Sequence, residues 1–166
     1  MRSLPVQKEI NIYMAYARSS DDKEFVEKFK KMLKQLGRLH KVTCFDIDIS
    51  AGTDWKKKKQ GQLETADIIL LLVSWNFLYS DYCVSTELKQ AIDKHKVGES
   101  RVIPVILQQC PWEDTQLNDL EPLPKDGPPF EEWSSWAQAL HNIYEGIKQV
   151  IKELQNPPLS SEDLSG

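Results

Sequence analysis

Short, continuous runs of apolar and often β-branched residues constrain this chain most. Three runs stand out, Ile10–Tyr16, Asp67–Ser74 and Arg101–Leu107, and a fourth, Lys41–Asp46, is weaker. Runs that stay apolar without alternating are typical of strands covered on both faces, as in parallel sheets. The sequence therefore predicts a parallel sheet in the interior of the molecule.

Helical patterns fill the gaps between these runs. Residues 21–36 carry an apolar stripe at helical spacing, with Asp21 expected as the N-cap and Gly37 as the end of the helix. Further stripes cover residues 84–92 and 136–154. Alternating strands and helices predict an α/β fold with flavodoxin-like connectivity, right-handed crossovers and helices on both faces of the sheet.

In such a fold the ligand crevice lies beyond the carboxyl ends of the strands. The helix that follows the second strong run is expected to begin near Ser80 or Asp81. The connections at this edge are Ala17–Asp21, Asp46–Trp55, Ser74–Cys83 and the proline-rich Gln108–Phe130. We expect functional residues in these connections.

Composition narrows the class of protein. The 166 residues fit one domain, expected at residues 10–154, with an N-terminal leader at 1–9 and a flexible, linker-like tail at 155–166. Lys and Arg total 21 against 25 Asp and Glu, a net charge of −4 that argues against a nucleic-acid partner. Because no apolar run approaches the ~18–20 residues of a membrane span, we expect a cytoplasmic protein without a membrane partner.

Cysteine, histidine and glycine patterns argue against metal and nucleotide-loop chemistry. Cys44, Cys83 and Cys110 form no CxxC pair and are expected to be ordinary thiols. The histidines show no HExxH spacing, and no GxGxxG or GxxxxGK[ST] loop is present. The sequence therefore predicts neither a bound metal nor a resident cofactor.

Four ordered motifs resemble those of TIR domains. They are Y-x-x-Y-x-x-x-x-D-D-x-x-F from Tyr13, F-D-x-D-I-x-x-G-x-x-W from Phe45, L-L-V-S ending at Ser74, and S-D-Y-C-x-x-x-E-L from Ser80. Later segments resemble the bacterial subgroup of the family, namely Val102–Leu107, Pro111–Trp112, Leu123–Gly127 and Trp133–Ser134. The resemblance spans about residues 10–154. It implies a five-stranded parallel sheet and TIR–TIR self-association through the Asp46–Trp55 loop.

The resemblance also implies an NAD+ glycohydrolase, with NAD+ as the substrate and no further cofactor. Glu87 matches the family's catalytic glutamate. The positions implied to bind substrate are Tyr13, Tyr16, Arg18, Asp46, Gly52, Trp55, Ser74 and Cys83. The chain departs from the familiar pattern twice, because Cys83 stands where many members carry the Trp of W-x-x-x-E, and Ala15 stands where many carry Ser.

Other hypotheses remain open at this point. The chain is also compatible with a non-catalytic TIR–TIR interaction module, or with a flavodoxin-like nucleoside transferase that uses a glutamate on ribose. From the residues alone, a solvated helix glutamate bordering the core is the favoured interpretation of Glu87. For an NAD+-cleaving enzyme, attack by water predicts ADP-ribose, whereas attack by an adenine nitrogen predicts a cyclic ADP-ribose isomer.

Overall fold

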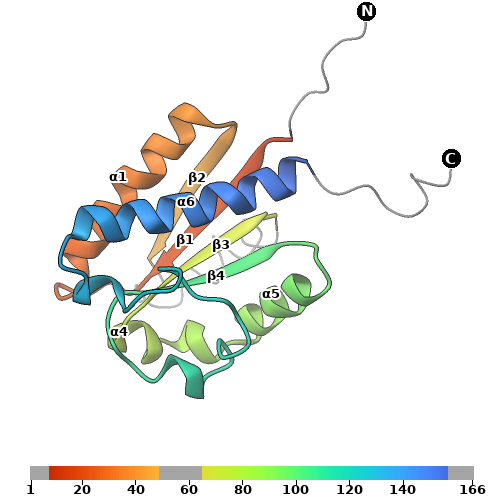
Figure 1. The fold of residues 1–166 in the computed structure, drawn as a ribbon. Coiled ribbons are helices and arrows are strands. Elements are labelled where there is room, and N and C mark those ends of the chain that lie inside the picture. The colour runs from red at the N-terminus through yellow and green to blue at the C-terminus, as the bar shows by residue number, and fades with distance from the viewer. Residues whose placement is uncertain (1–7, 49–64, 157–166) are drawn as a thin grey trace, which may run out of the picture.

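The computed structural model describes residues 8–48 and 65–156 as a parallel sheet between two layers of helices (Figure 1). The strands are β1 (Ile10–Tyr16), β2 (Val42–Asp48), β3 (Ile68–Val73) and β4 (Arg101–Ile106), in the order β2-β1-β3-β4. The α-helices are α1 (Lys23–Leu39), α4 (Trp75–Leu78), α5 (Thr86–Lys96) and α6 (Trp136–Gln155). Short 3₁₀ helices are η1 (Asp81–Val84), η2 (Trp112–Asp114) and η3 (Phe130–Glu132). The predicted flavodoxin-like α/β class is confirmed.

The expected fifth strand is reduced to a single residue. Among the described residues the sheet has four strands, and Leu123 forms one isolated parallel bridge beside β4. The Leu123 N–H donates to the Pro104 carbonyl at 2.9 Å, and its own carbonyl accepts from the Ile106 N–H at 2.9 Å. Pro122 and Pro124 flank it, and because proline has no N–H the ladder of hydrogen bonds ends there.

Two apolar clusters cover the two faces of the sheet. Side chains alternate along a strand, so Ile12 and Met14 of β1 face α1 and α6, whereas Tyr13 and Ala15 face α5. Strand β3 is buried along its whole length and contributes to both clusters. Figure 1 shows α1 and α6 on one side of the sheet, and α4 and α5 on the other.

The boundaries of α1 differ from the sequence prediction at both ends. Asp22, not Asp21, is the N-cap, and its side chain makes no capping hydrogen bond. The helix passes through Gly37 and ends two residues later, at Leu39. The prediction of Gly37 as the stop was wrong, because the helical bonding continues past it: the His40 N–H donates to the Leu36 carbonyl at 2.9 Å.

The start of α5 was also predicted too early. Residues 81–84 form the 3₁₀ helix η1, and the chain then turns extended at Ser85, with φ −78° and ψ 156°. Ser85 is therefore the N-cap of α5, in place of Ser80 or Asp81. Val84, which the stripe predicted as a packing residue, is 80% exposed because the extended residue breaks the helical register.

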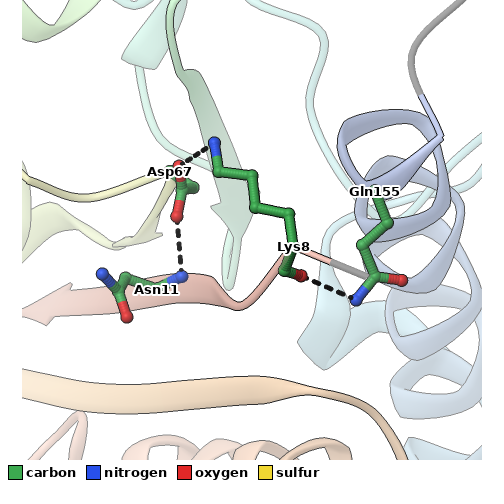
Figure 2. A network of polar contacts seen from close by, with 4 residues as sticks. All are labelled: Lys8, Asn11, Asp67 and Gln155. Carbon is green, nitrogen blue, oxygen red and sulfur yellow. Dashed lines mark hydrogen bonds and ion pairs between the residues drawn. The ribbon is translucent and has the colours of Figure 1, made fainter. Parts of the chain in front are cut away.

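A polar network centred on Asp67 ties the amino-terminal ends of the strands together (Figure 2). One Asp67 carboxylate oxygen accepts from the Asn11 N–H at 2.9 Å, and the other pairs with Lys8 Nζ at 3.0 Å. The Asp67 carbonyl accepts from the Arg101 N–H at 2.9 Å, and Gln155 Nε2 donates to the Lys8 carbonyl at 3.3 Å. The network therefore links β1, β4 and the end of α6.

Replacing Asp67 with Ala is expected to lower the free energy of unfolding by about 2 kcal/mol, because the partly buried Asn11 N–H loses a charged acceptor. The exposed Lys8 ion pair adds little to this loss. Urea unfolding measures the change, with Glu99→Ala, an exposed carboxylate, as the control. Equal effects of the two substitutions would contradict a structural role for the Asp67 network.

Candidate functional site

The carboxyl ends of all four strands meet at one edge of the sheet, because the strands are parallel. The strands end there at Tyr16, Asp48, Val73 and Ile106. Ser74 follows β3 directly, and the helix that carries Glu87 begins beyond α4 and η1. The residues predicted to form the site are therefore expected at this edge.

Glu87 is the second residue of α5 and is partly buried. Ser85 Oγ caps the helix by accepting a hydrogen bond from the Leu88 N–H at 3.1 Å. At this end of a helix the dipole stabilises negative charge, typically by about 0.3–1 kcal/mol. Burial raises the pKa of the Tyr82 phenol above its usual range, and the negative charge of Glu87 adds to this rise. The start of α5 thus carries a partly buried carboxylate at a capped helix end.

Tyr13 and Cys83 lie in the same apolar cluster as the start of α5. The Tyr13 ring is buried and stacks on Phe45 of β2, with 4.7 Å between ring centroids. Cys83 is buried, and burial raises the pKa of its thiol while a hydrogen bond with the Thr115 side chain lowers it. Tyr13, Cys83 and the helix of Glu87 therefore share one face of the sheet, and Cys83 is kept as a neutral thiol.

Tyr16 and Arg18 are not brought to the same face as Tyr13. Tyr16 is three residues further along β1, so the alternation of side chains turns it toward α1, where it packs against the opposite cluster. Lys30 Nζ lies 5.5 Å from the Tyr16 ring centroid. Tyr16 and Arg18 line a hollow of about 570 Å³ beside the first turns of α1, together with Lys23. The structure thus divides the predicted substrate-binding residues between two faces.

Ser74 is fully buried and joins the end of β3 to the start of α1. Its Oγ donates to Asp22 Oδ2 at 2.6 Å and accepts from the Phe77 N–H at 3.1 Å, which caps α4. Asp22 is only 2% exposed and also accepts from Asn76 Nδ2 at 3.3 Å. Sequence reasoning missed this role of Asp22, although the adjacent pair Asp21 and Asp22 in the first motif was the available signal.

The remaining predicted positions lie wholly or partly outside the described residues. Gly52 and Trp55 fall in residues 49–64, outside the described ranges. Asp46 lies in β2, where its backbone pairs with Met14, and its side chain is outside the description. Their assignment to substrate binding stays a prediction.

In residues 8–48 and 65–156, no group of three or more His, Cys, Asp or Glu side chains is arranged to hold a metal ion. No helix in the same part of the chain has the length and apolar character needed to cross a membrane.

Comparisons with known proteins agree with the architecture. A family model for the TIR domain matches residues 12–143. A Sinorhizobium fredii protein, described as uncharacterized protein y4lF, is 33% identical over 153 residues, covering 89% of this chain and 47% of that protein. This chain thus spans about half the length of the curated relative it matches. A chain from the crystal structure of the RPS4 and RRS1 TIR domain heterodimer matches with a TM-score of 0.54 and 12% sequence identity, covering 84% of this chain and 97% of that one. At this identity the match shows a similarity of fold.

Replacing Ser74 with Ala is expected to lower the free energy of unfolding by about 2–3 kcal/mol, since the buried Asp22 carboxylate loses a donor and α4 loses its cap. Ser135→Ala is a matched control, because Ser135 Oγ caps α6 by accepting from the Gln138 N–H but has no buried carboxylate partner. The control should lose about 1 kcal/mol. Equal losses in urea unfolding would show that the Asp22 bond adds nothing to capping.

Proposed function

This chain belongs to the TIR domain family, and we propose that it is an NAD+ glycohydrolase that cleaves the nicotinamide–ribose bond. The observation that carries the proposal is the position of Glu87, a partly buried carboxylate in the first turn of α5. Glu87 lies at the capped amino-terminal end of the helix, where the helix dipole stabilises negative charge. The residue types and their order along the chain match those of TIR domains.

Cleavage of the nicotinamide–ribose bond requires few catalytic groups from the protein. Nicotinamide in NAD+ is already a pyridinium cation, so it takes the electron pair of the broken bond and departs neutral, without a general acid. Positive charge then develops on the ribose, as in glycoside hydrolysis, where two carboxylates are usual. Because no leaving group needs a proton here, one carboxylate near the ribose is sufficient, and Glu87 is proposed to stabilise this charge.

The second step decides the product. If water attacks the ribose carbon, it loses a proton and gives ADP-ribose. If an adenine nitrogen of the same molecule attacks, the product is a cyclic ADP-ribose isomer. Exclusion of water from the site favours the cyclic product. Chromatography of the products distinguishes the two routes.

Glu87→Gln is expected to reduce nicotinamide release by at least about 100-fold, because the neutral amide no longer stabilises the ribosyl cation. Release from NAD+ is followed chromatographically, at low protein concentration and again under crowding. Asp93→Asn is the matched control, since Asp93 is an exposed carboxylate on the same helix. An inactive wild type under both conditions would refute the glycohydrolase, whereas full activity in Glu87→Gln would refute the assignment of Glu87.

A TIR–TIR interaction module is the second candidate function. The structural match is to one chain of a TIR domain heterodimer. In α4 and directly after it, the side chains Trp75 and Tyr79 are 47% and 79% exposed, with 6.4 Å between their ring centroids. Exposed aromatic residues are enriched where proteins associate. Assembly and catalysis are compatible, and we propose that self-association activates the enzyme.

The double substitution Trp75→Ser and Tyr79→Ser is expected to weaken self-association at least tenfold, because the contact loses two aromatic side chains. Sedimentation velocity over a range of concentrations measures the association. Val97→Ser, which alters another exposed apolar residue at the far end of α5, is the control. A monomeric wild type, or equal association of the wild type and the double variant, would rule out this surface.

A further inference from the structure

At the junction between η1 and α5, the Cys83 carbonyl takes its donor from a distant segment, whereas the Ser85 carbonyl already accepts from the Lys89 N–H at 3.2 Å. The extended Ser85 interrupts the helical hydrogen bonding, so α5 begins anew at Thr86. Buried or partly buried carbonyls at such a break require partners from elsewhere in the chain. Gln116 Nε2 supplies one, donating to the Cys83 carbonyl at 2.8 Å, with a longer contact of 3.5 Å to the Ser85 carbonyl.

Gln116 is itself held firmly in the long connection between β4 and α6. Its neighbour Thr115 donates through Oγ1 to the Trp112 carbonyl at 2.6 Å and accepts from the Leu117 N–H at 3.2 Å. Leu117 is fully buried in the same apolar cluster as Leu88 of α5. The amide of Gln116 is therefore presented from a fixed point on the core that supports α5.

Hydrogen bonds of Ser85 join η1 to the first turn of α5, close along the chain to the carbonyl that Gln116 contacts. Ser85 Oγ donates to the Tyr82 carbonyl at 2.7 Å and accepts from the Leu88 N–H at 3.1 Å. Gln116 holds the Cys83 carbonyl, two residues before the capping Ser85, so it fixes the segment from which this cap is built. The direction in which Glu87 leaves the helix depends on this turn.

We propose that Gln116 is a positioning residue for Glu87, acting through the η1–α5 junction and without touching the substrate. This inference rests on the proposed glycohydrolase function for its kinetic readout. A carboxylate that stabilises transition-state charge works through its position, and a displacement of ~1 Å can cost about 100-fold in rate. Losing the Gln116 donor loosens the turn only in part, so we expect kcat to fall about tenfold.

The test compares Gln116→Met, which keeps the side-chain length without a donor, and Gln116→Glu, which offers only acceptors at pH 7. Gln138→Met, at an exposed glutamine on α6, is the control. We measure kcat and KM for nicotinamide release, Tm, and amide hydrogen exchange over residues 85–89 without NAD+. Both Gln116 variants should lower kcat about tenfold and accelerate hydrogen exchange over residues 85–89. KM should change less than about twofold, because Gln116 does not contact NAD+ in this proposal.

Unchanged kcat with unchanged exchange over residues 85–89 would overturn the proposal. Faster exchange spread evenly over the chain, with kcat per folded molecule unchanged, would make Gln116 a general structural residue and also overturn it. If the wild type releases no nicotinamide, the glycohydrolase function fails on its own. Hydrogen exchange then still decides whether Gln116 holds the start of α5.

Discussion

Burial of β3 on both faces is the constraint on which the rest of the structure depends. Every residue from Ile68 to Val73 is at most 2% exposed. Full burial of a large aliphatic side chain contributes about 1.5–3 kcal/mol, so leaving either face open would be costly. Strands β1 and β4 pair with the backbone N–H and C=O groups of β3 along its two edges. The two apolar faces of β3 are left to be covered by helices.

The same arrangement organises the edge at which the strands end. As β3 leaves the core, Ser74 immediately contacts the buried Asp22 at the start of α1, which joins the layers on opposite faces of the sheet. The chain then continues through α4 and η1 to Ser85, whose extended backbone ends η1 and allows α5 to begin at the next residue. Glu87 therefore lies in the first turn of a new helix, held by its own cap and by Gln116 from a distant connection.

The candidate site was predictable where a residue's place follows from its position in an element. The sequence analysis placed Glu87 in the helix that follows the second strong apolar run, and the structure places it in the first turn of that helix. The separation of Tyr13 and Tyr16 was also available in principle, because residues three apart on a strand point to opposite faces. The family motif names both tyrosines together, and that grouping concealed the alternation.

The sequence by itself determined the strands and the α/β class, because apolar content and periodicity report burial. Ile10–Tyr16, for example, is β1 at the predicted residues. Only the tertiary structure decided that Asp22 bonds Ser74, 52 residues away, and that Gln116 bonds the Cys83 carbonyl, 33 residues away. Local patterns reveal which residues are buried, but a polar side chain takes its partner from whichever segment the packing of the core brings within hydrogen-bond reach.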